Sequence, residues 1–168
     1  QLTANLDSDG HTFIGRFPGS LGNSLRVSIC PPSVSDSGFD AWTYKGSFDA
    51  APGTSAYAAA NDATNDEVHV AIVDINGEFS GTKGTVLETY PFMSVASNAI
   101  NADDGGNIYV KDVINQNSQY VHFVDFDSNF RVSGNAGTAI TPGVTKEFLG
   151  TQAGEAAINF AFDSGGDA

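Results

Sequence analysis

The sequence has one cysteine, few basic residues and no long apolar run. Because Cys30 stands alone among 168 residues, an internal disulfide is impossible, and its place after Val27, Ser28 and Ile29 predicts a buried, inert thiol. The chain carries 7 Lys+Arg against 20 Asp+Glu, a formal net charge of −13. Phosphate backbones and anionic membrane surfaces attract clustered cations, and the basic residues here are scattered singly. The composition therefore argues against nucleic acid and membranes as partners.

Length and composition indicate one turn-rich domain over residues 1–168. A chain of this length can bury about two-thirds of its unfolded surface. The 19 Gly and 12 Phe, without helical runs of Ala, Leu, Glu and Lys, favour a mostly β or α+β fold. No stretch approaches the roughly 20 apolar residues of a membrane span. The start at Gln1 leads us to expect a piece of a longer protein, with its acidity on a solvated surface.

The clearest structural unit lies between Asn65 and Met93. The β-branched run from Val68 to Val73 favours a buried strand that closes at Asp74, because branching at Cβ suits a pleated strand better than a helix. Two glycine-containing turns follow, at 75–77 and 81–84, and residues 85–93 are again typical of a strand. The sequence thus predicts a strand, a glycine-bounded loop and a returning strand.

Four further stretches have the composition of strands. Residues 25–30 alternate apolar and polar, which predicts a strand with one buried face, ended by Pro31-Pro32. Alternation in 39–48 (FDAWTYKGSF) predicts a second strand. Residues 120–126 and 156–163 are expected to form a third and a final strand. The expected fold is an antiparallel sheet, or a two-layer β-sandwich, flanked by a few short helices.

The remaining segments are expected to be loops and short helices. Residues 50–65 predict a loop with at most one helical turn, and 131–144 a mobile or hairpin-like segment. A short helix is expected over 94–101, with Val95 and Ala99 facing inward. A second is expected over 107–115, capped by Asn107.

Two features suit a carbohydrate-binding module with a structural calcium. Trp42 and Tyr44 could stack on a sugar, although such aromatics are more often core residues. Asp7 and Asp9 begin an acidic D-S-D-G that could start a calcium loop. However, the position that needs a bidentate Glu in such a loop falls on Pro18, so an ordinary turn is favoured.

No motif supports a catalytic or metal site, and no cofactor is predicted. The D-S-G-G at 163–166 lacks the neighbours and the positioned histidine of a serine protease. The histidines have no spacing that converges on a metal, so packed or solvated side chains are favoured: His11, His69 and His122. The loop glycines miss the phosphate-binding spacing and fit turns better: Gly77, Gly81 and Gly84. The pair Asp103-Asp104 lies in a polar loop. The sequence predicts no enzyme, and so a mechanical or adhesive role.

Three segments resemble the contractile tail sheath proteins of T-even-type myophages. Residues 65–97 (NDEVHVAIVDINGEFSGTKGTVLETYPFMSVAS) match a strand–loop–strand pattern of that family. Residues 16–25 (RFPGSLGNSL) are similar to its R-x-P-G-x-W-G-N-x-L pattern, with Leu21 in place of Trp. Residues 109–121 resemble its Y-x-x-x-V-I-N-x-x-S-x-Y-V stretch. The resemblance covers most of the chain between Phe13 and Asp127 and is weakest at 132–157.

The resemblance implies a structural role and no cofactor. Sheath subunits form stacked hexameric rings around a tail tube above a baseplate, and they shorten together to drive the tube through the host envelope. The chain would be a fragment of such a subunit, made in the host cytoplasm and present in the virion. Residues 163–168 would start the connection to a further C-terminal domain. Because the family assembles largely through its terminal strands and C-terminal domain, we expect the 168-residue chain to be a monomer.

Overall fold

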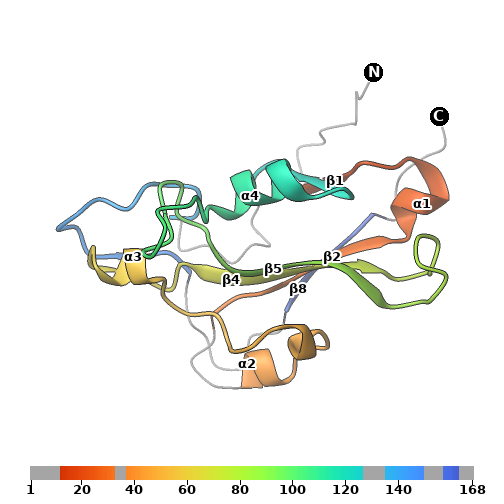
Figure 1. The fold of residues 1–168 in the computed structure, drawn as a ribbon, viewed down its shortest axis with the longest axis horizontal. Helices are drawn as coiled ribbons and strands as arrows, with labels where there is room; N and C mark the ends of the chain where they lie inside the picture. Colours follow the sequence, from red (N-terminus) through yellow and green to blue (C-terminus); the bar gives the residue numbers. More distant parts are fainter. Residues whose placement is uncertain (1–11, 33–36, 127–134, 150–156, 163–168) are drawn as a thin grey trace.

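The computed structural model describes residues 12–32, 37–126, 135–149 and 157–162. Its centre is a four-stranded antiparallel sheet in the order β5-β4-β2-β8 (Figure 1). The strands are β2 (Leu25–Cys30), β4 (Glu67–Asp74), β5 (Thr85–Ser94) and β8 (Ile158–Ala161). The predicted strand–loop–strand unit is confirmed as the β4–β5 hairpin. The predicted final strand is confirmed in part, since 156 and 163 lie outside the described residues.

The two central strands, β2 and β4, are buried on both faces. Leu25, Val27 and Ile29 belong to one core cluster, whereas Ser28 and Cys30 are buried on the opposite face. The strand over 25–30 is therefore confirmed, but the expectation of a single buried face is wrong. Alternation of apolar and polar residues misled because small polar side chains such as Ser28 can be buried once they have a hydrogen-bond partner.

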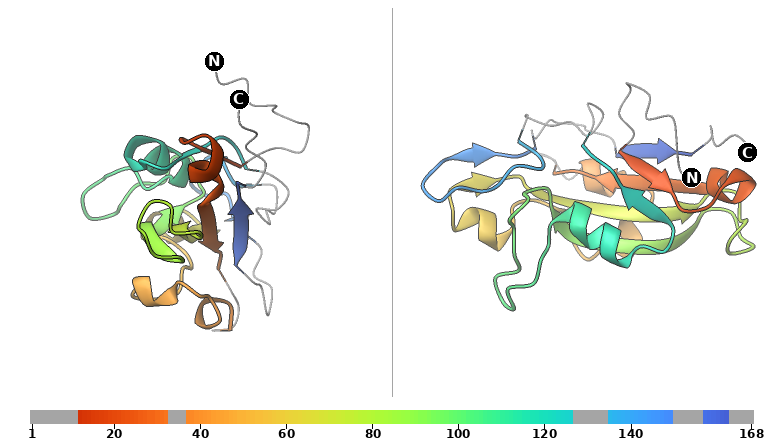
Figure 2. Two further views of the ribbon diagram at one scale, coloured as in Figure 1. Left: turned by 90° about the vertical axis from the view of Figure 1, so that its right-hand side faces the viewer. Right: turned by 90° about the horizontal axis from the view of Figure 1, so that it is seen from above.

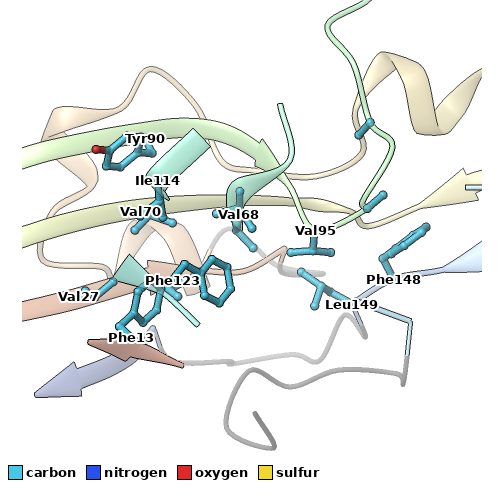
Figure 3. Close-up of a cluster of buried hydrophobic side chains, with 14 of the residues drawn as sticks. Phe13, Val27, Val68, Val70, Tyr90, Val95, Ile114, Phe123, Phe148 and Leu149 are labelled. Carbon is cyan, nitrogen blue, oxygen red and sulfur yellow. The ribbon is translucent and has the colours of Figure 1, made fainter. Parts of the chain in front are cut away.

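The first face of the sheet is covered by a helix and a two-stranded ladder. Helix α4 (Val110–Asn117) and the antiparallel pair β1 (Phe13–Gly15) and β6 (Val121–Phe123) lie above the sheet in Figure 1. Phe13 and Phe123 stack with ring centroids 4.7 Å apart, and Figure 3 shows them beside Val27. Further along the same cluster, Val95 lies close to Leu149 (Figure 3). This face holds the main hydrophobic core.

The second face is covered by the segment from Ser37 to Phe48. It contains helix α2 (Ser37–Asp40) and the 3₁₀ helix η1 (Lys45–Ser47), below the sheet in Figure 1. The predicted strand over 39–48 is therefore wrong. Successive hydrogen bonds three residues apart, such as Trp42 N–H to Phe39 O (3.0 Å), coil this segment so that its aromatic rings pack on the sheet.

Two short helices and a short strand pair lie at the ends of the sheet. Helix α1 (Gly19–Asn23) lies beside the loop of the β4–β5 hairpin, and α3 (Ala56–Ala59) lies at the opposite end (Figure 1). Strands β3 (Ala63–Thr64) and β7 (Lys146–Glu147) form a short parallel pair. The left view of Figure 2 looks along the sheet and shows helices on both of its faces. The loop with one helical turn expected over 50–65 is confirmed, and β3 is added to it.

Two expectations about helices need correction. Ser94 ends β5, and residues 95–101 form bends and turns instead of a helix, although Val95 and Ala99 are buried as expected. Helix α4 begins at Val110 instead of Asn107, because the Asn107 side chain accepts a hydrogen bond from Tyr109 N–H (2.8 Å) and holds a turn before the helix. The strand expected over 120–126 is confirmed but limited to β6. The segment expected over 131–144 lies partly outside the described residues.

The α+β, mostly β, class and the antiparallel sheet with a few short helices are confirmed. The face opposite α2 carries a two-stranded ladder and a helix instead of a second full sheet. Within the described ranges, every helix is too short or too polar to cross a membrane.

Candidate functional site

The loop 75–84 at the end of the β4–β5 hairpin is organised around one buried carboxylate, that of Asp74. Its Oδ1 accepts hydrogen bonds from the backbone N–H groups of Gly77 (2.9 Å) and Glu78 (3.1 Å). Its Oδ2 accepts from the N–H groups of Phe79 (3.0 Å) and Ser80 (2.8 Å), and from the Ser80 hydroxyl (2.8 Å). The loop therefore folds around its own anion.

A second segment, at the junction of α1 and β2, closes this cage. The Ser24 hydroxyl donates to Oδ1 of Asp74, and the Ser24 carbonyl accepts from Ile75 N–H (2.7 Å). Gly22, in α1, is the close-contact residue of this segment, because a Cβ there would lie 2.1 Å from the carbonyl oxygen of Phe17. The start of β2 and the hairpin loop are thus held as one unit.

The charge on Asp74 is stabilised by these donors. Burial alone would raise the pKa of Asp74, but the hydrogen bonds from Ser24, Ser80 and Phe79 outweigh burial and hold the pKa well below its ordinary value. The cage accordingly contains an ionised carboxylate. Its partners are hydroxyl and amide groups, and a carboxylate whose pKa is held this low is a poor base for activating Ser24 or Ser80. The arrangement therefore shapes a loop.

The three predicted turn glycines are confirmed, since Gly77, Gly81 and Gly84 all have positive φ. Gly77 has an additional constraint, because a Cβ there would lie 3.0 Å from the backbone nitrogen of Lys83. The outer part of the loop is exposed, including Glu78 and Lys83. The loop therefore has a hydrogen-bonded base and an exposed tip.

The three segments that carry the sheath resemblance meet beside this loop. Phe17 from the first, Phe79 from the second and Tyr120 from the third pack together, with ring centroids 5.0 Å (Phe17–Phe79) and 5.3 Å (Phe79–Tyr120) apart. Arg16 N–H donates to Tyr120 O (2.8 Å), and Arg16 Nε donates to Val121 O (3.2 Å). The segments are distant in sequence but form one end of the molecule. We take this end, the Asp74 loop with its aromatic cluster, as the candidate functional site.

The opposite end of β4 holds another buried carboxylate. Oδ1 of Asp66 accepts from Ser55 N–H (2.8 Å), and Oδ2 accepts from the hydroxyls of Ser55 (2.8 Å) and Ser94 (2.5 Å). Ser55 also caps α3 by accepting from Ala58 N–H (3.1 Å). Asp66 therefore joins α3 to the end of β5. Neither aspartate cage was predicted from the sequence. The feature that could have indicated them is an Asp at each end of the β-branched run, with serines nearby.

The two described histidines lie apart and have different surroundings. His69, on β4, is buried; its Nδ1 accepts from Phe92 N–H (3.0 Å), and its Nε2 lies 2.6 Å from Ala50 O. Burial lowers the pKa of His69, opposed by the bond to Ala50. His122 is exposed on β6, which pairs with β1 and not with β4. The expectation of packed or solvated histidines is confirmed for these two, and His11 lies outside the described residues.

The other residues considered from sequence lie outside any common site. Cys30 is buried, as expected, and burial raises the pKa of its thiol to about 12. Trp42 is a core residue, 5% exposed, and Tyr44 is half-buried against it. Asp103 and Asp104 are exposed in their loop. Among the residues that the structure describes, no three His, Cys, Asp or Glu side chains gather as metal ligands would. The D-S-D-G and D-S-G-G motifs fall outside the described residues.

The chain is similar to a phage tail protein over part of its length. It is 32% identical over 75 residues to the tail sheath protein of Salmonella phage ViI. The aligned segment is 45% of this chain and 10% of that protein, so the chain corresponds to a small part of this relative. No protein-family model and no solved structure matches the chain.

Proposed function

We propose that this chain is one domain of a phage contractile tail sheath protein. The observation that carries the proposal is the 32% identity over 75 residues to a protein named as a tail sheath protein. The packing of all three sheath-like segments beside the Asp74 loop supports the proposal. These segments are distant in sequence, and their contact gives the resemblance one common location in the fold. On this proposal the chain is structural and not an enzyme, and it uses no cofactor.

The partners follow from the sheath role. The complete protein stacks in hexameric rings around the tail tube, contacts the baseplate, and shortens with its neighbours to drive the tube through the host envelope. It is made in the host cytoplasm and becomes part of the virion. Residues 1–168 form a single domain, with 163–168 leading toward a C-terminal domain that carries much of the assembly surface. The separate 168-residue chain is therefore a monomer.

Negative-stain electron microscopy of the complete gene product, purified without other phage components, tests the function. Long, regular tubes of sheath-like diameter are expected. Dispersed particles under several salt conditions would contradict the proposal. Light scattering on the 168-residue chain tests the monomer separately: tubes or hexamers at micromolar concentration would show that the assembly surface lies within this domain.

Trp42, the main aromatic residue behind the carbohydrate-binding alternative, is buried. The Trp42 ring packs against Phe48 with centroids 5.0 Å apart, and Trp42 Nε1–H donates to Ser28 Oγ (2.9 Å) inside the protein. Because the Trp42 side chain is only 5% exposed, it leaves almost no ring surface on which a sugar could stack. Nothing in the described residues therefore favours this second function.

A further inference from the structure

His69, on β4, joins two layers of the protein through its two ring nitrogens. Its Nε2 lies 2.6 Å from the carbonyl oxygen of Ala50, just after the segment 37–48 that covers the second face of the sheet, here called the covering segment. Its Nδ1 lies 3.0 Å from the backbone nitrogen of Phe92 on β5. A carbonyl oxygen can only accept and a backbone N–H can only donate, so the proton is on Nε2 and Nδ1 is bare. The two contacts therefore fix one neutral tautomer of the ring.

The bond to Phe92 depends on an irregularity in β5. The register of the β4–β5 ladder shifts between Val68 and Val70. The one β4 residue between them, His69, therefore lies opposite two residues of β5, Pro91 and Phe92. Phe92 has a φ of +51°, a left-handed conformation that residues with a Cβ rarely adopt. The neutral His69 ring thus accepts a hydrogen bond from a strained part of the strand.

Aromatic rings enclose the His69 side chain, which is fully buried. Phe48 stacks on it with ring centroids 4.5 Å apart, and Trp42 is nearly parallel to it at 6.4 Å. The Phe92 ring meets it at an interplanar angle of 86° and a centroid distance of 4.5 Å. Phe48 and Trp42 belong to the covering segment, so His69 forms part of the contact between that segment and the sheet. A displacement of the His69 ring would loosen both the Phe92 bulge and the covering segment.

A second proton on the His69 ring is incompatible with this arrangement. A proton on Nδ1 would face the Phe92 N–H, so the bond would be replaced by two opposed donors. The new charge would also be buried, which is costly without a paired anion. Aromatic faces attract cations, but that attraction does not restore an acceptor for the Phe92 N–H. Burial correspondingly holds the pKa of His69 below its ordinary value.

Other charges near the ring have to be separated from its own titration. β5 faces His69 with Pro91 and Phe92, which carry no charge. Burial raises the pKa of Glu67, two residues before His69 on β4, so Glu67 can titrate in a similar pH range and needs a control. Among the described residues, the titratable and charged groups on the elements around His69 are Cys30 and Arg26 of β2, Glu67 of β4, Asp40 and Lys45 of the covering segment, and Asp49 beside Ala50.

We propose that His69 is a pH-sensitive switch, in which the neutral ring holds the Phe92 bulge and the covering segment on the sheet and protonation releases both. The closed state has its full stability above about pH 6.5, the pKa of an exposed imidazole. Below that pH, the ratio of open to closed molecules should rise about tenfold for each pH unit until the ring titrates in the closed state. The switch depends on contacts within this chain and not on the sheath function, which the microscopy tests separately.

A protein with one histidine makes the test direct. The double variant His11→Gln, His122→Gln leaves His69 as the only imidazole, so the imidazole NMR signals report on this ring alone. Amide hydrogen exchange of this protein is then measured between about pH 8 and about pH 5. The exchange protection of Phe92 N–H should fall about tenfold per pH unit below about pH 6.5.

Two further N–H groups show how far the opening extends. The Trp42 indole N–H, which donates to Ser28 Oγ (2.9 Å), reports on the covering segment and should lose protection in parallel with Phe92. The backbone N–H of Ile75, which donates to Ser24 O (2.7 Å) at the other end of β4, should keep constant protection. The opening is therefore expected to be local.

Variants separate the imidazole from its neighbours. His69→Gln supplies an amide oxygen and an amide N–H but cannot be protonated, so its protection should be independent of pH over this range, although lower because the ring packing is lost. Glu67→Gln is the matched control on the same strand. Asp36→Asn neutralises a carboxylate that lies between β2 and α2 in the sequence. Both controls should keep the profile of the parent chain. If His69→Gln does not fold, the single-histidine protein decides the question.

Four results would overturn the proposal. The first is a His69 ring that titrates near pH 6.5 while Phe92 stays protected, because protonation would then be compatible with the closed state. The second is protection of Phe92 that does not depend on pH. The third is an equal loss at Ile75 and Phe92, which would indicate global acid unfolding. The fourth is a pH dependence that persists in His69→Gln, or that disappears in Glu67→Gln or Asp36→Asn, which would assign it to another group.

Discussion

The two ends of β4 solve the same problem with different donors. Asp74 and Asp66 are both fully buried carboxylates that hold a neighbouring segment in place. Each oxygen of Asp74 accepts from two backbone N–H groups of the following loop. Oδ2 of Asp66 accepts from two serine hydroxyls, those of Ser55 and Ser94. The same side chain thus makes a largely local cage at one end and a long-range junction at the other.

This difference determines how strictly each site requires a carboxylate. A backbone N–H can only donate, so both oxygens of Asp74 must remain acceptors. A hydroxyl can donate or accept by rotating about its C–O bond. The Asp66 site can therefore adapt to an amide, whereas the Asp74 site cannot.

The largest expected effect is that of Asp74→Asn. The new amide NH₂ would face two backbone N–H donors, and the charge that all the donors stabilise would be lost. We expect the free energy of unfolding to fall by about 3 to 5 kcal/mol, measured by urea denaturation. Glu78→Gln, on the exposed surface of the same loop, is the control and should change it by less than about 0.5 kcal/mol.

The pH dependence of the parent chain should differ from that of Asp74→Asn. Because the folded-state pKa of Asp74 is lower than the unfolded value of about 4, its stabilisation is complete above that pH and is lost as the pH falls toward the folded pKa. The gap in unfolding free energy between the two proteins should be constant from neutral pH down to about pH 5 and narrow below about pH 4. A gap that is independent of pH through this window would show that the charge on Asp74 contributes nothing. Glu67, whose pKa is raised chiefly by burial, acts with the opposite sign but is common to both proteins.

Gly77→Ala should cost less than the loss of the carboxylate. It combines an unfavourable positive φ with the contact to Lys83 N, so we expect destabilisation of about 2 kcal/mol in the same urea assay. Gly81→Ala is the matched control, because Gly81 has nearly the same φ but open space around a new Cβ. Its cost should be about 1 kcal/mol. Equal costs at the two positions would mean that the close contact relaxes freely.

The smallest expected effect is that of Asp66→Asn. The Ser55 and Ser94 hydroxyls can rotate to accept from the new NH₂, while the amide oxygen keeps the bond from Ser55 N–H. We expect a loss of about 1 kcal/mol in chemical denaturation. A loss equal to or larger than that of Asp74→Asn would reverse the comparison between the two ends of the strand.

Sequence reasoning succeeded where structure is decided locally. The β-branched run of β4 and the glycines at 77, 81 and 84 encode a hairpin within one stretch, and the hairpin is present. The same reasoning failed at 39–48, where period-two alternation resembled a strand. There the aromatic residues pack on the sheet, with a hydrogen bond from Trp42 to Ser28 and contacts to the buried face of β4. These partners lie outside the ten residues on which the prediction was based.

The candidate site was visible only in pieces. Its three segments were singled out, but their meeting at Phe17, Phe79 and Tyr120 depends on how the strands and α4 are stacked. The Ser24–Asp74 contact joins the residue just before β2 to the last residue of β4, and no local pattern specifies that pairing.

The position of β2 in the sheet has a consequence for how the chain folds. Its neighbours are β4 and β8, and residues 158–161 are separated from β2 by most of the length of the chain. During synthesis, β2, β4 and β5 can therefore pair early, while one backbone edge of β2 stays unpaired until residues 158–161 have emerged. An open strand edge can pair with another nascent chain. Aggregation between neighbouring nascent chains should therefore be most frequent during that interval. Truncation before Ile158 should also yield aggregates, even though most of the core is already encoded.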